Sequence, residues 1–175
     1  MEDHRYPIGE FSPPSSHTPA DVRGAIETIA ACPRELRAAV AGLDDARLET
    51  PYRDGGWTVR QLVHHIADSH MNAYIRCKLA VAENQPRIKT YEQDDWAKFD
   101  DASHAPITVS LDLIEALHER WVRFLRSLPD SAFDRKLDHP EIGVITLAYV
   151  VFLYAWHGRH HTTQISSLRK RKGWK

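Results

Sequence analysis

Residues 147–172 read LAYVVFLYAWHGRHHTTQISSLRKRK, and this stretch decides the fold. Successive residues of an α-helix lie about 100° apart around its axis, and on that geometry most of the large apolar residues of the stretch fall in one sector. We therefore expect one long amphipathic helix that begins near Thr146 and ends at Gly173. Its buried stripe is expected to comprise Leu147, Val150, Val151, Tyr154, Ile165 and Leu168.

Two histidines lie in the same sector as this stripe. His157 and His161 are four residues apart, so their side chains stack on one face and point into the protein. Each buried neutral imidazole needs a polar partner, and a shared divalent ion would satisfy both at once. The alternative is two core histidines hydrogen-bonded to other polar groups. His160 falls off the stripe, which predicts an exposed or structural role.

Three further amphipathic segments precede this helix. Thr18 followed by Pro19 starts the first, which Pro33 is expected to break or kink. Thr58 with Gln61 forms a capping-box pattern that starts the second, and this helix is expected to run to about residue 82. The third is expected to begin after residue 110. Four such helices predict an all-α, four-helix bundle.

The connections between these helices are long. Links at 44–57, 83–109 and 129–145 exceed those of a minimal bundle, and long links often cover a functional site. We expect a short helical turn near 94–99 and a small hairpin within 129–145. Residues 1–17, rich in proline and serine, predict an extended N-terminal arm, and residues 18–175 a single helical-bundle domain.

The composition is that of a single globular domain and excludes several classes of function. The chain has 175 residues, a formal charge of −1 and a pI of about 6.8, so no basic face for nucleic acid or an anionic membrane is expected. The basic run 169–172 is interpreted as cations in the last turn of a helix. The apolar pattern predicts no bilayer-spanning stretch, and the N-terminal residues are not expected to act as a secretory leader. Cys32 and Cys77, without metal-binding spacing, are expected to be reduced thiols in a cytoplasmic protein.

The second helix offers three more candidate ligands. His70 lies near the centre of its apolar face, which suits a core histidine. His64 and His65 flank that face on opposite sides, and periodicity does not choose between them. The five remaining histidines appear isolated in the sequence: His4, His17, His104, His118 and His139.

Several stretches together resemble a known family. Residues 55–68, GGWTVRQLVHHIAD, and residues 156–161, WHGRHH, are similar to the second and last helices of the DinB-like superfamily. The opening residues 6–11, YPIGEF, and residues 51–54, PYRD, resemble its YfiT branch, whose members are labelled metal-dependent hydrolases and linked to bacillithiol S-transfer. The likeness runs from about residue 6 to the end of the chain.

The resemblance implies a metal site and an assembly. It places one divalent ion, zinc or in some cases nickel, on three histidines: the second of the paired histidines, His65, and the two of the last helix, His157 and His161. It also implies a homodimer. Relatives carry a histidine where this chain has Gln164; that position is not a family ligand, so the departure is expected only to alter the pocket wall.

Three protein ligands without a fourth are typical of a catalytic zinc site. The vacant position can hold water, whose pKa zinc lowers to about 7, or a thiol, which the metal holds as a thiolate. We therefore expect an enzyme acting on a small molecule, either a hydrolase or a thiol S-transferase, with the family association favouring S-transfer. The alternative is a non-catalytic bundle that uses the metal for stability, storage or sensing.

Other residues have weaker indications of a role near the site. Asp68 is a candidate for orienting a ligand histidine, with a surface helix carboxylate as the favoured alternative. Trp57 and Trp156 are expected to form hydrophobic walls. Candidates for binding a substrate carboxylate are Arg53, Arg76 and Arg159.

Overall fold

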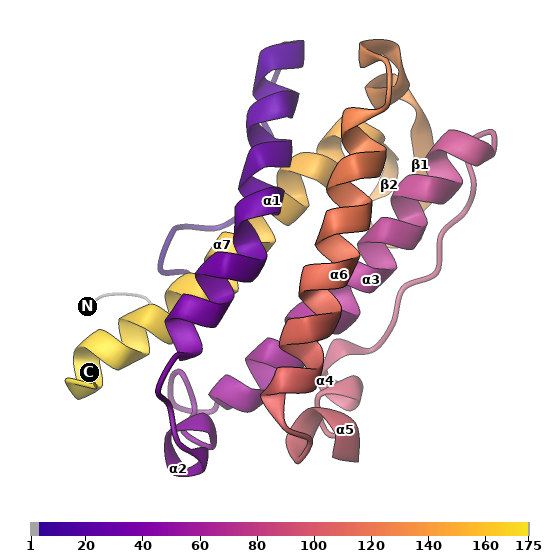
Figure 1. The fold of residues 1–175 in the computed structure, drawn as a ribbon. Coiled ribbons are helices and arrows are strands. Elements are labelled where there is room, and N and C mark those ends of the chain that lie inside the picture. Colours follow the sequence, from indigo (N-terminus) through magenta and orange to yellow (C-terminus); the bar gives the residue numbers. More distant parts are fainter. Residues whose placement is uncertain (1–3, 175) are drawn as a thin grey trace.

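The computed structural model describes residues 4–174 and is mainly helical, as the sequence predicts (Figure 1). The long helices are α1 (Pro19–Val40), α3 (Val59–Ala82), α6 (Ile107–Arg126) and α7 (Leu147–Lys172). The short elements are α2 (Asp45–Leu48), α4 (Gln93–Trp96), α5 (Asp100–Ser103), the 3₁₀ turn η1 (Asp130–Asp134) and strands β1 (Lys136–His139) and β2 (Gly143–Thr146).

The sequence signals for helix ends are confirmed at three of the long helices. Thr18 and Thr58 cap α1 and α3, each in a reciprocal capping box. Gly173 ends α7 in the left-handed conformation that glycine adopts without steric cost. The start of α6 was predicted wrongly: the helix begins at Ile107, four residues before Leu111. Its first turn is largely solvent-facing, so it lacks the apolar period on which the prediction depended.

The four long helices enclose two apolar clusters. Helix α1 packs against α6 and α7, and α3 also packs against α6 and α7. One cluster joins the first half of α1 to the end of α3 and the start of α7, and the other joins the opposite ends of the same helices. Each long helix therefore passes from one cluster to the other. The groups at these crossings are polar or polarisable, and all but the half-buried His157 are buried: Cys32, His70, His118, His157 and His161.

The short elements gather at the two ends of the bundle. Figure 1 shows α2, α4 and α5 at one end and the β1–β2 hairpin at the other. The hairpin is antiparallel, with Leu137 opposite Ile145, and lies within the predicted segment 129–145. Helix α2 was not anticipated, because four residues are too few to show a helical period. Within residues 4–174, every helix is too short or too polar to serve as a membrane span.

The chain before α1 packs along α7. Over residues 4–17 the structure contains no helix or strand. Phe11 packs edge-on against Tyr149, and the indole of Trp156 donates a hydrogen bond to the carbonyl oxygen of Gly9. The remainder of the predicted arm, residues 1–3, lies outside the described residues. The division into an arm and one domain stays a prediction.

Gly158 marks a close approach of α7 to α1. A Cβ atom there would lie 2.8 Å from the Cys32 sulfur, whereas one on the exposed Gly24 of α1 would meet nothing within 4 Å. Gly24→Ala is expected to stabilise the protein by about 0.5–1 kcal/mol through helix propensity. Gly158→Ala gains the same helix propensity but overpacks the core, which costs about 1–3 kcal/mol. We therefore expect this substitution to destabilise the protein.

Urea denaturation of both variants measures this difference. Equal stabilisation by the two substitutions would show that α1 and α7 are not in tight contact at this point.

Candidate metal centre

Three histidines from two helices converge between the apolar clusters. His157 and His161 project from adjacent turns of α7, and His65 faces them from α3. The Nε2 atoms of His65 and His157 are 3.2 Å apart, and one nitrogen from each of the three rings lies within 4.8 Å of the others. The residues that the family resemblance singled out are therefore brought together in space.

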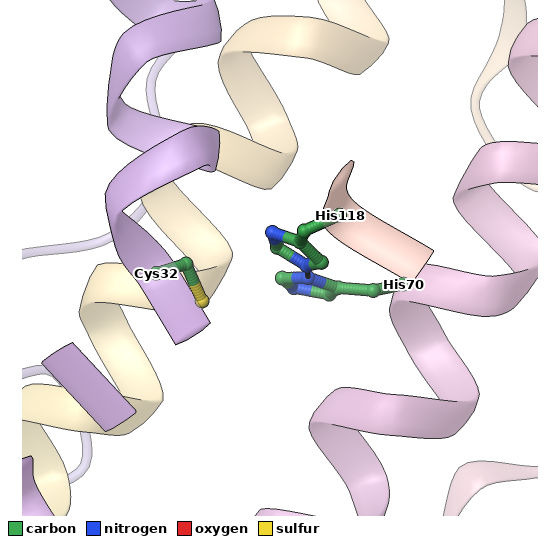
Figure 2. Close-up of side chains that lie close together, drawn as sticks. All are labelled: Cys32, His70 and His118. Carbon is green, nitrogen blue, oxygen red and sulfur yellow. Dashed lines mark hydrogen bonds between the residues drawn. The ribbon is translucent and has the colours of Figure 1, made fainter. Parts of the chain in front are cut away.

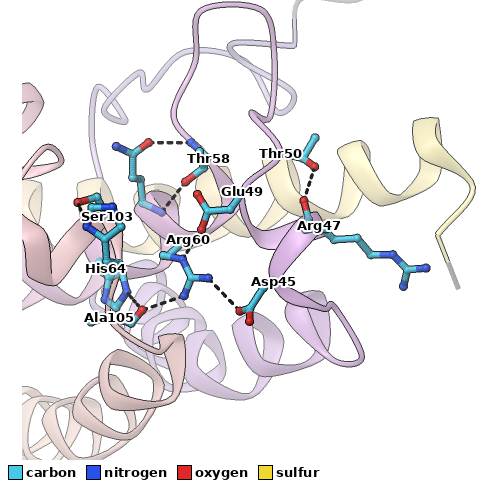
Figure 3. A network of polar contacts seen from close by, with 12 residues as sticks. Asp45, Arg47, Glu49, Thr50, Thr58, Arg60, His64, Ser103 and Ala105 are labelled. Carbon is cyan, nitrogen blue, oxygen red and sulfur yellow. Dashed lines mark hydrogen bonds and ion pairs between the residues drawn. The ribbon is translucent and has the colours of Figure 1, made fainter.

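The neighbouring His64 points to a different part of the molecule. Its Nδ1 atom lies 2.7 Å from the Ser110 hydroxyl, and its Nε2–H donates to the carbonyl oxygen of Ala105. That carbonyl also accepts a hydrogen bond from Arg60, which is paired with carboxylates of the α2 segment (Figure 3). The structure thus decides between the paired histidines, and His65 is the one that faces α7.

Burial keeps the three rings neutral. Desolvation, followed by the charge of nearby His160, lowers the pKa of His65 to about 3. The pKa values of His157 and His161 are well below the usual value, first through burial and then through neighbouring imidazoles. At neutral pH each ring therefore has one nitrogen with a free lone pair, the form that binds a metal ion.

Hydrogen bonds orient the lone pairs of the two α7 rings. His161 donates its Nδ1–H to the Gln164 side-chain oxygen at 2.8 Å, because the amide nitrogen of Gln164 is committed to the Arg5 carbonyl oxygen and to His160. The Nδ1 atom of His157 lies 3.1 Å from the Nε2 atom of His70. Both Nε2 atoms are left for the centre of the cluster, an arrangement typical of metal-bound histidines.

The donor set fits a divalent ion. Two nitrogens on one tetrahedral zinc ion lie about 3.3 Å apart, since each bond is about 2.0–2.1 Å long. The 3.2 Å separation of the His65 and His157 Nε2 atoms matches this spacing. Within residues 4–174, the group of candidate donors comprises three histidines and no fourth His, Cys, Asp or Glu. A metal held here would keep a coordination position for another ligand.

The cluster borders a polar cavity of about 670 Å³. His65 and His161 form part of its wall, and Trp57 covers His65 with ring centroids 4.6 Å apart. Loops that follow α2 and α3 supply much of the rest. The charged residues lining the cavity are Arg5, Arg53, Glu92, Asp94 and Glu141. A small polar molecule could therefore reach two of the three histidines.

Several expectations for single residues need correction. His118 is not isolated: it is 2% exposed, and its Nε2 atom lies 2.8 Å from the Nδ1 atom of His70. Of the exposed or structural role predicted for His160, the structure has the structural one: the ring is buried and stacks on Trp156 with ring centroids 4.4 Å apart. Both were missed because their partners are set by packing or lie far away in sequence. The predicted core position of His70 is confirmed, since its side chain is fully buried.

The weaker candidates divide between the cavity and other surfaces. Arg53 lines the cavity, but Arg159 lies on a separate surface beside Trp156. Arg76 donates to the Lys89 carbonyl oxygen. Asp68 does not orient the two α7 histidines, since their Nδ1 atoms face other residues, and an orienting role toward His65 stays a prediction. Trp57 lines the cavity as expected. Trp156 does not line it, and is stacked on His160 beside a separate surface pocket.

The fold and this cluster define a class: a four-helix bundle with a histidine site beside a polar cavity. The family model of the DinB superfamily matches residues 28–165. The chain belongs to the DinB superfamily.

Close relatives extend this likeness over nearly the whole chain. A Bacillus cereus protein named "Putative metal-dependent hydrolase" is 51% identical over 99% of this chain and 100% of its own length. A Bacillus mycoides relative with the same description is 49% identical over the same shares. The solved structure of YfiT from Bacillus subtilis, described as "a probable metal-dependent hydrolase with an unusual four-helix bundle topology", is 44% identical. It superposes with a TM-score of 0.95, covering 98% of this chain and 99% of that one.

Proposed function

We propose that this protein is a metal-dependent hydrolase of a small polar molecule, with one divalent ion held by His65, His157 and His161. The observation that carries the proposal is the convergence of these three rings beside an accessible polar cavity, which His65 and His161 line. The names of the close relatives support the same assignment. Zinc is the first choice of metal because it accepts three imidazoles and leaves one position open, and nickel is the second.

The residues of the chain have distinct tasks in this proposal. The two α7 histidines are neutral and oriented, so the site is ready to bind an ion without losing a proton from either ring. Trp57 shields the His65 face of the site from bulk water. When bound, the ion supplies a Lewis acid that activates water, or a thiol, at its open position.

The carboxylates and guanidinium groups of the cavity wall suit a substrate with polar or charged groups. Arg53 is the candidate for a substrate carboxylate. Its guanidinium already donates hydrogen bonds to the Tyr52 hydroxyl and the Asp54 carbonyl oxygen. Substrate binding would therefore cost less side-chain entropy than it would for a freely moving arginine.

Thiol S-transfer, which the family resemblance implies, would use the same ligands with a low-molecular-weight thiol at the open position. The homodimer and the cytoplasmic location stay predictions. A metal that serves only stability, storage or sensing is the competing role.

Cobalt substitution tests whether the site is open. We expect azide or a simple thiol to change the visible spectrum of the cobalt form, because either can occupy the free position. Ester and amide hydrolysis, screened beside thiol conjugation, is expected to disappear on chelation and return with metal. An invariant spectrum, together with activity that does not respond to metal, would contradict the enzyme proposal and favour the structural role.

A further inference from the structure

A chain of hydrogen-bonded imidazoles runs from the candidate metal centre across the bundle to α1. The Nδ1 atom of His157 lies 3.1 Å from Nε2 of His70, and Nδ1 of His70 lies 2.8 Å from Nε2 of His118. The Nδ1 atom of His118 then lies 2.8 Å from the carbonyl oxygen of Ile29. Figure 2 shows the rings of His70 and His118 next to each other; their planes are inclined by 20° and their centroids are 5.0 Å apart.

The end of this chain depends on a proline inside a helix. In an α-helix the carbonyl of one residue accepts from the N–H four residues later. The residue four positions after Ile29 is Pro33, which has no N–H, although α1 continues through it. The Ile29 carbonyl is therefore available to the ring of His118. Pro33, for which the sequence predicted a break or a kink, lies within a continuous helix and leaves the buried Ile29 carbonyl oxygen as a hydrogen-bond acceptor.

A carbonyl oxygen can only accept a hydrogen bond, and this determines which ring nitrogen carries the proton in each histidine of the chain. His118 must carry its proton on Nδ1, which leaves its Nε2 as an acceptor. His70 must then donate from Nδ1 and accept at Nε2, so His157 must donate from Nδ1. Each ring holds one proton, because both inner histidines are buried and their hydrogen bonds go to imidazoles and a carbonyl rather than a carboxylate.

We propose that His70 and His118 are positioning residues that hold His157 in the one tautomer whose Nε2 lone pair faces the metal centre. This inference rests on the metal ligation proposed above. The Ile29 carbonyl oxygen fixes the tautomer of His118, which fixes that of His70, which in turn fixes that of the ligand His157. Gln164 does the same for His161 in a single step. Partners of this kind typically change metal affinity 10–100-fold when removed.

Cys32, His70 and His118 form a rival grouping, since their donor atoms lie within 4.8 Å of one another and could hold a second metal (Figure 2). Proton counting argues against it. A metal on Nδ1 of His70 would move the ring proton to Nε2, where it faces His157 and would demand the lone pair of that ring at Nδ1. The two sites would then compete for the same proton. The 2.8 Å nitrogen separation is also that of a hydrogen bond and shorter than the spacing of about 3.3 Å on a zinc ion.

Ring-nitrogen NMR of the full-length protein tests the proton order directly. Long-range ¹H–¹⁵N spectra of the metal-free and zinc-loaded forms report which nitrogen of each histidine carries hydrogen. We expect His70 and His118 to be Nδ1–H tautomers in both forms, and His157 to be Nδ1–H with zinc on Nε2. An Nε2–H tautomer at His70 or His118 would overturn the proposal, as would zinc bound to either ring.

Zinc affinity tests the positioning role. His70→Phe is expected to weaken zinc binding 10–100-fold in competition with a chromophoric chelator. His70→Gln is expected to recover part of the loss, because an amide can accept from His157 and donate to His118. His64→Phe, which replaces a buried histidine of the same helix outside the chain, should keep the wild-type affinity. Circular dichroism of each variant verifies that the helices are intact.

The outcomes separate this inference from the proposed function. If the wild-type protein binds zinc and His70→Phe binds it equally tightly, the positioning role is wrong and the metal assignment stands. If the wild-type protein binds no zinc, the metal assignment fails first, and so does the positioning role that depends on it.

Discussion

His157→Ala is expected to remove metal binding and, with it, all metal-dependent hydrolysis. The ring lies at the centre of the cluster, 3.2 Å from His65 and with its centroid 4.5 Å from that of His161. Its loss leaves two ligands, too few to retain an ion that a three-histidine site binds. Since removal of an orienting partner alone costs 10–100-fold, we expect affinity to fall by more than about 100-fold. Metal analysis after gel filtration should find far less than about one equivalent per chain.

Matched variants make this result specific to the three ligands. His65→Ala and His161→Ala should behave like His157→Ala. His64→Ala and His160→Ala should retain the metal, although both remove a buried ring, because His64 bonds to Ser110 and Ala105 and His160 bonds to Gln164. A full equivalent of zinc on any of the first three variants would reject the ligand assignment. Loss of metal from His64→Ala with intact helices would also contradict it.

The metal-free protein is expected to unfold in mild acid. Burial lowers the pKa of His65 to about 3 and that of His118 to about 4, whereas an unfolded histidine titrates near 6.5. Between these values the unfolded chain binds protons that the folded chain excludes, so stability falls as the pH drops. Each such group lowers the free energy of unfolding by about 1.4 kcal/mol per pH unit. His70, His157 and His161 act in the same direction.

Urea titrations from pH 7 to pH 4 measure this slope. His118→Phe should make it shallower by about 1.4 kcal/mol per pH unit, because one proton acceptor of the unfolded state has been removed. Asp68 acts in the opposite direction, since burial raises its pKa to about 6 and it binds a proton in the folded state first. A stability that stays constant across this range would show that the histidines are solvated and not buried between the apolar clusters.

The buried histidine layer connects the fold to its proposed chemistry. A metal ion would satisfy one nitrogen of each of three rings, and hydrogen bonds to Gln164, His70 and the Ile29 carbonyl satisfy other ring nitrogens of the layer. In acid and without metal, this polar layer therefore destabilises the folded protein. At neutral pH its histidines are uncharged and oriented, so the layer can bind a metal ion. Removing the metal should accordingly lower stability as well as activity.

Much of the fold follows from local signals in the sequence. The capping residues Thr18 and Thr58, the terminal Gly173 and the apolar period of 147–172 predict helices that the structure contains at nearly the same bounds. These signals succeed because caps and periodicity depend on residues within a turn or two of each other. The pair His157 and His161 belongs to this group, since a spacing of four places both side chains on one face.

The tertiary structure decided the parts of the site that helical periodicity leaves open. Whether His64 or His65 faces α7 depends on how α3 is rotated against its neighbours, and their side chains flank the apolar face symmetrically in the sequence. The contact of His70 with His118 joins residues 48 positions apart, and the carbonyl at its end is free only because Pro33 lies one turn further along α1. The sequence by itself determined which side chains could bind a metal. Packing of the four helices decided which lone pairs meet, because the direction of a lone pair is set by partners that lie far apart along the chain.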